Sequence, residues 1–269
     1  MSGQWDGHAH VFSRELPFVE PRRYTPAYAA TADQFIGHLN ASGLAGGLLT
    51  QPSFLGTDNG HMLAAVARYP NRLRAVVVVD PGVSDAELDA LGDQGAVGVR
   101  LNLEGLALPD LTRPPWPALF ERLARRNWHV EIHRKAVDLP VLLAPLMASG
   151  VRICIDHFGR PDPQQGADDP GFQALLRAAA SGRVWVKVSA AYRTGGVERG
   201  EVLAPTLLAA LLTAVDASRL IWASDWPHTQ HESQVTHRDC FEALERWAGS
   251  AVLASRLRTE GLVSLLDGV

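Results

Sequence analysis

Two histidines close to the start of the chain are spaced for joint chemistry. His8 and His10 lie in the segment Trp5-Asp6-Gly7-His8-Ala9-His10-Val11-Phe12. Because alternate side chains of a β-strand point to the same face, both imidazoles are expected on one face of a short strand. Such a pair can bind one divalent cation or donate two hydrogen bonds to one substrate oxygen.

Further side chains capable of chemistry follow other apolar segments of the chain. They are Arg100 with Asn102, His133, His157, Ser189 with Arg193, and Asp225 with His228. Imidazoles and carboxylates can transfer protons, and guanidinium groups bind anionic substituents through forked hydrogen bonds. Taken singly, each could instead be structural, as a satisfied histidine, a turn-capping aspartate or a paired arginine. Their shared position at the ends of apolar segments favours a site.

The elements that must position these residues alternate regularly. Eight apolar segments are predicted strands: 5–11, 47–51, 73–80, 97–103, 128–133, 151–157, 184–189 and 220–224. Segments with helical periodicity lie between and after them: 31–42, 59–68, 85–93, 116–126, 139–148, 172–180, 202–215 and 234–247. Capping-box spacing at Thr31 with Gln34, and at Ser84 with Glu87, supports two of the helix starts.

This alternation predicts a parallel sheet covered by helices. Eight units in one chain of this length favour a (β/α)₈ TIM barrel, a single domain over residues 1–269 with an extra C-terminal helix over 251–266 that closes it. A doubly wound open sheet is the alternative, but no Gly-x-Gly-x-x-Gly follows the first strand. In a barrel the C-terminal strand ends meet at one rim, so the polar residues would converge on one pocket.

Composition narrows the class of partner. The chain has 46% hydrophobic and 20% charged residues and a formal net charge of −4, without blocks of one sign. It offers no basic surface for nucleic acid and no apolar run of the roughly 20 residues that span a membrane. Cys154 and Cys240 lie in no metal-binding spacing. We expect a cytoplasmic protein that acts on a small molecule.

Eight motifs, in this order along the chain, resemble the amidohydrolase superfamily, and most closely its lactonase branch. They lie at 6–12 (DGHAHVF), 23–26 (RYTP), 51–53 (QPS), 56–59 (GTDN), 98–102 (GVRLN), 136–140 (AVDLP), 155–161 (IDHFGRP) and 224–228 (SDWPH). The resemblance implies a (β/α)₈ hydrolase with its site on strands one, five, six and eight. It also implies that His8, His10, His157 and Asp225 are the reacting groups.

The resemblance extends to substrate binding, with two departures. Tyr24, Arg100 and Arg193 match positions that bind substrate carboxylates in pyrone-dicarboxylate lactonases, and we add Asn102, Ser189 and His228 to the predicted substrate-binding set. Leu106 stands where those lactonases have a second arginine. His133 stands where they have a tyrosine and work without metal.

The second departure favours a metal. His8, His10, His133 and Asp225 would supply three imidazoles and one carboxylate, a ligand set that suits Zn²⁺ better than Mg²⁺ or Ca²⁺. We therefore predict zinc or another divalent metal held by these four residues, with His157 donating to the substrate carbonyl. Metal-free catalysis, as in the pyrone lactonases, is the alternative.

The predicted function is hydrolysis of a small anionic lactone, such as a pyrone dicarboxylate, a sulfomuconolactone or a sugar-acid lactone. Asp225 would act as the general base toward an attacking water. Two other classes stay open: a zinc-dependent decarboxylase of an aromatic or enol acid, and a non-catalytic ligand-binding barrel. Release of CO₂ would indicate the decarboxylase, and a binding protein would need no general base.

Overall fold

Eight parallel strands follow one another around a barrel in the computed structural model, which describes residues 3–269. In chain order they are β1 (Trp5–Ala9), β2 (Gly46–Thr50), β3 (Leu73–Val77), β4 (Ala96–Asn102), β5 (His129–His133), β6 (Arg152–Ile155), β7 (Val184–Val188) and β8 (Leu220–Trp222). The ring closes just beyond β8, where the Asp225 amide donates to the His8 carbonyl at 3.0 Å. The predicted (β/α)₈ barrel is confirmed.

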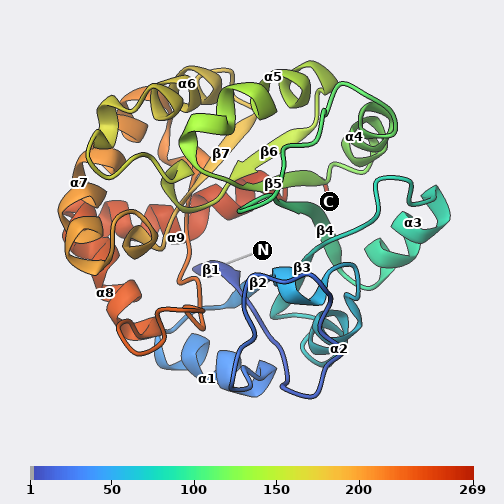
Figure 1. Ribbon diagram of the computed structural model, residues 1–269. Helices are drawn as coiled ribbons and strands as arrows, with labels where there is room; N and C mark the ends of the chain where they lie inside the picture. The colour runs from blue at the N-terminus through green and yellow to red at the C-terminus, as the bar shows by residue number, and fades with distance from the viewer. Residues whose placement is uncertain (1–2) are drawn as a thin grey trace.

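A ring of helices surrounds the strands (Figure 1). They are α1 (Ala32–Ala41), α2 (Gly60–Arg68), α3 (Asp85–Asp93), α4 (Trp116–Arg125), α5 (Leu139–Ser149), α6 (Pro170–Ala179), α7 (Val197–Ala214) and α8 (His237–Ala248), and a further helix, α9 (Ala251–Leu265), lies outside this ring. Both predicted capping boxes are present, at the starts of α1 and α3. The seventh helix begins at Val197, five residues before its predicted start. Within residues 3–269 no helix is long and apolar enough to cross a membrane.

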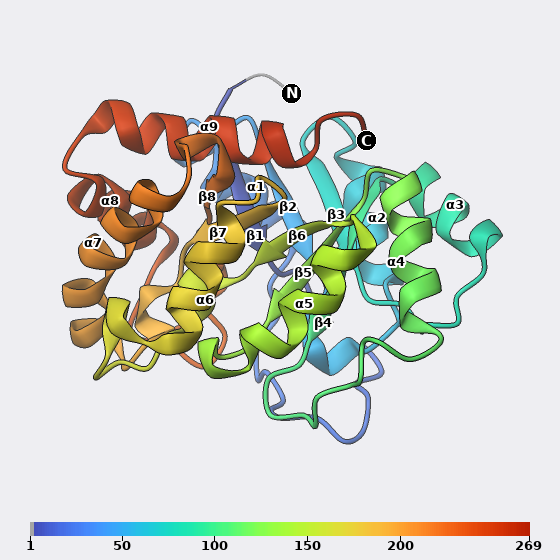
Figure 2. The same ribbon diagram turned by 90° about the horizontal axis from the view of Figure 1, so that it is seen from above.

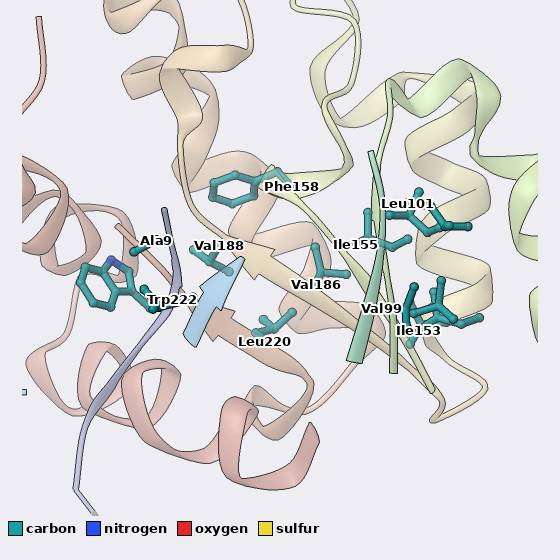
Figure 3. Close-up of a cluster of buried hydrophobic side chains, with 14 of the residues drawn as sticks. Ala9, Val99, Leu101, Ile153, Ile155, Phe158, Val186, Val188, Leu220 and Trp222 are labelled. Carbon is teal, nitrogen blue, oxygen red and sulfur yellow. The ribbon is translucent and has the colours of Figure 1, made fainter. Parts of the chain in front are cut away.

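Outward-facing strand residues form the core between the barrel and its helices. Ile153, Ile155, Val186 and Val188 belong to this cluster together with buried leucines of the helices (Figure 3). These side chains alternate along each strand with residues that face the barrel axis, as the pleat requires. The strands of the barrel are therefore buried on both faces.

The extra C-terminal helix closes the N-terminal end of the barrel. Helix α9 lies across this end in Figure 2 and packs against β1, β7 and β8. A Cβ on Gly261 would lie 1.9 Å from the Leu220 carbonyl oxygen, so only glycine lets the helix approach β8 so closely. Its last turns cover a buried cluster that we call the apolar end, formed by Trp5, Leu48, Val76, Val97, Cys154, Trp185, Ile221, Leu262, Leu265 and Leu266.

Candidate active site

One pocket at the C-terminal rim gathers most of the predicted site residues. Its lining includes His10, Tyr24, Arg100, Asn102, His133, His157, Arg193 and Asp225. These side chains come from β4 and β5 and from the segments after β1, β6, β7 and β8. Arg23 and Gln230, which were not predicted, also line it. The barrel thus brings residues from distant parts of the chain to one opening.

Unusual backbone conformations direct two of these side chains. His157 lies two residues after the end of β6 and Asp225 three residues after the end of β8, and both have left-handed φ values, 52° and 61°. Non-glycine residues in this region are strained by an amount of order 1–3 kcal/mol, and such residues cluster at functional sites. The sharp turns aim both side chains into the pocket.

The Asp225 carboxylate is held by one oxygen and exposes the other to the imidazoles. Its Oδ2 accepts hydrogen bonds from the Tyr192 hydroxyl at 2.6 Å and the Arg193 Nε at 2.7 Å. Its buried Oδ1 has no hydrogen-bond partner in residues 3–269. This oxygen lies 3.7 Å from Nε2 of His8, 3.9 Å from Nε2 of His10 and 3.7 Å from Nε2 of His157. One water or one small cation fits the chemistry of that gap.

Burial sets the charge of these groups. It lowers the pKa of His10 to about 4 and that of His157 to about 3, and it lowers the pKa of His8 well below its usual value. Burial alone would raise the pKa of Asp225, but Arg193 and the surrounding imidazoles outweigh it and hold that pKa well below its usual range. At neutral pH the site therefore contains an ionised carboxylate beside neutral imidazoles.

A layer of buried charge lies beneath the pocket. We call this set the charged layer: Arg100 on β4, Glu131 on β5, Asp156 after β6 and Lys187 on β7, with the neutral imidazole of His8 on β1 in contact with them. The Lys187 ammonium contacts the Glu131 carboxylate, and Arg100 Nη2 lies 2.9 Å from Asp156 Oδ2. Together with Arg193 and Asp225 above them, the buried charges form three opposite-sign pairs. Such balance is what burial of charge demands.

Glu131, Asp156 and Lys187 of this layer were missed by the sequence reasoning. Lys187 is an isolated charge in an otherwise apolar strand segment, and Glu131 stands between apolar neighbours in the same way. Both are fully buried. A charge in a strand buried on both faces is a usable signal, because such residues are almost never fully buried unless paired.

Two predicted substrate-binding residues take other positions. The Ser189 hydroxyl lies 2.9 Å from Nδ1 of His157, behind that ring. His228 Nδ1 lies 3.2 Å from the Tyr192 hydroxyl. Neither residue is part of the pocket lining in the described chain. Their hydrogen bonds in the structure are made with the side chains of His157 and Tyr192.

The two predicted anion-binding arginines are already engaged by carboxylates. Arg193 donates to Asp225, and Arg100 pairs with Asp156 while its Nη1 donates to the Gln51 carbonyl at 3.2 Å. Arg23, in contrast, donates to the Ser53 hydroxyl at 3.4 Å, lies 5.9 Å from the centre of the Tyr24 ring and has no carboxylate partner in residues 3–269. Arg23 is therefore the guanidinium most available to a substrate anion.

His133 lies apart from the predicted metal ligands. Its Nε2 accepts a hydrogen bond from Arg160 at 3.2 Å, and its Nδ1 lies 3.2 Å from the Asn102 amide oxygen. Two other groups have donor atoms close enough to hold a metal ion: His8 with His157 and Asp225, and His8 with Glu131 and Asp156. The structure therefore gathers a buried His, Asp and Glu cluster, but not the four-residue set predicted from the sequence.

Comparisons with known proteins match almost the whole barrel. A family model described as amidohydrolase matches residues 5–257. The 2-pyrone-4,6-dicarboxylate hydrolase of Comamonas testosteroni is 33% identical over 245 residues, which is 84% of this chain and 77% of that protein. The 4-sulfomuconolactone hydrolase of Hydrogenophaga intermedia is 31% identical over 238 residues, or 84% and 75%. A crystal structure from Acinetobacter baumannii, described as a probable 2-pyrone-4,6-dicarboxylic acid hydrolase with citric acid bound, superposes with a TM-score of 0.95 at 39% identity, covering 98% of this chain and 99% of its own.

Proposed function

This chain belongs to the amidohydrolase family, and from that premise we propose that it hydrolyses the ring ester of a small anionic lactone. The observation that carries the proposal is the Asp225 carboxylate, whose Oδ1 lies without a hydrogen-bond partner among the described residues beside three imidazole nitrogens. A carboxylate placed in this way is suited to take a proton from water. The two relatives named as hydrolases of a pyrone dicarboxylate and a sulfomuconolactone support a cyclic ester as substrate.

The charge of the pocket supports an anionic substrate. Arg23, Arg100 and Arg193 all line it, and Tyr24 and Asn102 add polar groups. Two of the arginines have carboxylate partners, so Arg23 is the residue proposed to bind a carboxylate or sulfonate of the substrate directly. The related crystal structure from Acinetobacter baumannii is described as having citric acid bound, and citric acid is a polycarboxylate.

The proposed reaction uses the residues in two roles. Asp225 Oδ1 takes a proton from a water molecule as the water oxygen attacks the ester carbonyl, while Tyr192 and Arg193 hold the carboxylate by Oδ2. His157 donates from Nε2 to the developing oxyanion when the Ser189 hydroxyl donates to Nδ1. The ring C–O bond then breaks, and Asp225 returns the proton to the leaving oxygen.

We assign no step to a metal, because the ring nitrogens do not fit the zinc site expected from the sequence. Both nitrogens of His133 have partners, and one of them is a guanidinium, which can only donate. Nδ1 of His8 lies 2.8 Å from the Lys187 ammonium, which stands within the group formed by His8, Glu131 and Asp156. If a divalent cation did bind, His157 and Asp225 would be the residues with ligand atoms to offer it, and it would lower the pKa of a bound water.

A panel of lactones tests the proposal. Wild-type protein should release acid from a pyrone dicarboxylate or a sulfonated muconolactone faster than from a neutral lactone of the same ring size, and Asp225→Asn should abolish this. Asp93→Asn, at the exposed end of α3, is the matched control and should keep full activity. CO₂ release from enol or aromatic acids would support the decarboxylase instead. Binding without turnover in the whole panel would contradict the proposal.

A further inference from the structure

The Lys187 side chain is the least expected group in the barrel. Its ammonium is fully buried, and Nζ has three neighbours that can accept a hydrogen bond. They are the Glu131 carboxylate, which forms a very short contact, Nδ1 of His8 at 2.8 Å and Asp156 Oδ1 at 3.3 Å. An ammonium has three N–H groups and no lone pair, so the three acceptors match its three donors.

This contact determines where His8 carries its proton. Burial alone would lower the pKa of Lys187, but Glu131 and Asp156 outweigh it and raise that pKa, so the ammonium stays charged. Since it can only donate, Nδ1 of His8 must accept. A neutral imidazole has one N–H, and in His8 that N–H is consequently on Nε2.

The neighbouring histidine is fixed from the opposite side. Nδ1 of His10 lies 2.6 Å from the carbonyl oxygen of Thr50, which can only accept, so His10 carries its proton on Nδ1. Its Nε2 is then an acceptor, and it lies 3.2 Å from Nε2 of His8. The two assignments are made independently and agree, because His8 donates where His10 accepts.

We propose that Lys187 is a positioning residue that fixes a one-way hydrogen-bond chain from Lys187 through His8 and His10 to the Thr50 carbonyl. The chain leaves His8 with an N–H, not a lone pair, on the side that faces Asp225. The lone pair on Nε2 of His10 accepts the hydrogen bond from Nε2 of His8. Asp225 Oδ1 is then the acceptor left to take a proton from water, so this inference rests on the proposed function for its catalytic consequence.

The tautomer itself can be measured without substrate. In protein labelled with ¹⁵N-histidine, long-range ¹H–¹⁵N correlation spectra at neutral pH report which ring nitrogen of His8 is protonated, with His8→Gln identifying its signals. We expect protonated Nε2 and bare Nδ1 in the wild type. In Lys187→Met the remaining neighbours of Nδ1 are the Glu131 and Asp156 carboxylates, each at 3.4 Å, which only accept. The proton should therefore move to Nδ1.

Two further variants keep the experiment decisive. Lys187→Met combined with Glu131→Leu removes one charge of each sign and places no new donor beside Nδ1 of His8, so it preserves the charge balance if the single variant fails to fold, and it should show the same move to Nδ1. Lys135→Met, which changes the other lysine of the chain at an exposed position, should leave His8 unchanged. A wild-type His8 protonated on Nδ1, or an unchanged tautomer without Lys187, would overturn the proposal.

Activity then separates this inference from the proposed function. The double variant should lower kcat for the lactone roughly 10²-fold or more with little change in KM, because a wrong tautomer misplaces a proton without removing a substrate contact. If the tautomer moves and kcat does not, the positioning role fails. If the wild type turns over no lactone while His8 is protonated on Nε2, the function fails and the tautomer assignment stands.

Discussion

The two ends of the barrel interior are built on the same strands with opposite chemistry. On β7, Trp185 belongs to the apolar end and Lys187, two residues later, to the charged layer. On β6 and just after it, Cys154 and Asp156 are related in the same way. Residues two apart point to the same face of a strand. On each of these strands, a shift of two residues therefore leads from an apolar side chain to a charged one on the same face.

This difference indicates how the fold offsets the unfavourable free energy of burying charge. Replacing buried ion pairs by apolar groups is often neutral or stabilising, so the charged layer is a poor source of stability. The apolar end, closed by α9, removes large side chains from water and is the favourable part of the interior. We infer that stability comes mainly from one end and the reaction from the other, and the following changes test that division.

The largest effect is expected at the charged end, on activity. Asp225→Asn keeps the shape of the side chain but cannot accept a proton, so kcat should fall by roughly 10²–10⁴. The measurement is the initial rate of acid release from the best lactone of the panel, with thermal unfolding as the check that the fold persists. A rate close to that of wild type would remove Asp225 from the mechanism.

The next effect is expected at the apolar end, on stability. Leu265 of α9 is fully buried, and Leu265→Ala should lower the free energy of unfolding by about 2–5 kcal/mol because it leaves a cavity. Urea titration measures the loss, and kcat of the remaining folded protein should be unchanged. Val252→Ala on the same helix, where the side chain is 73% exposed, is the matched control. Equal losses in the two variants would contradict the division.

Acid should weaken the folded state through the histidines. His10 and His157 have folded pKa values of about 4 and 3, whereas an unfolded histidine titrates near 6.5. Between pH 6.5 and about 4 the unfolded chain binds more protons than the folded protein. As the pH is lowered through this range, the free energy of unfolding therefore decreases by about 1.4 kcal/mol per pH unit for each of the two histidines. Glu131 opposes this, since burial raises its pKa and the folded state then takes up a proton first.

Calorimetry checks this pH dependence. Unfolding at a pH between 5 and 6, in buffers of different ionisation enthalpy, should show net proton uptake, because several buried histidines outweigh the single glutamate. Proton release on unfolding, or a protein as stable at pH 5 as at pH 7, would show that the imidazoles are charged in the fold.

A smaller effect is expected at the pocket mouth. Arg23→Met should raise KM for anionic lactones about tenfold and leave kcat nearly unchanged, because it removes one charge-assisted hydrogen bond at a partly solvated position. Arg22→Met is the matched control, since Arg22 pairs with Glu20 and donates to Thr25 at 2.7 Å. An equal rise in KM for neutral lactones would show that Arg23 does not bind the anion.

The fold was predictable from the sequence because its signals are local. Strand and helix periodicity, the capping residues at Thr31 and Ser84 and the polar residues at strand ends all lie within short windows of the chain. They locate the rim and most of the pocket lining, including His157 and Asp225. The start of α7 at Val197 was not predicted, because the first residues of the helix, Val197-Glu198-Arg199-Gly200, contain little apolar periodicity.

The partners of each site residue were not predictable in the same way. Lys187 meets His8 across 179 residues, and Arg160, which engages His133, comes from the loop after β6. Which nitrogen of a histidine is free depends on such contacts and not on the histidine's own position. His133 was the deciding residue for the predicted zinc site. The hydrogen bonds that Asn102 and Arg160 make with His133 could not be predicted from the sequence.

The smallest effect is expected from removal of metal. Dialysis against a chelator should leave lactone hydrolysis unchanged, and purified protein should contain no stoichiometric zinc. The three buried pairs, Lys187 with Glu131, Arg100 with Asp156 and Arg193 with Asp225, already balance, so a divalent cation would add two uncompensated charges. Loss of activity on chelation, restored by zinc, would show that a metal takes part in the reaction and would contradict the metal-free mechanism. The His8 spectrum tests the Lys187 contact separately, because His157 and Asp225 are the residues with ligand atoms to offer a cation.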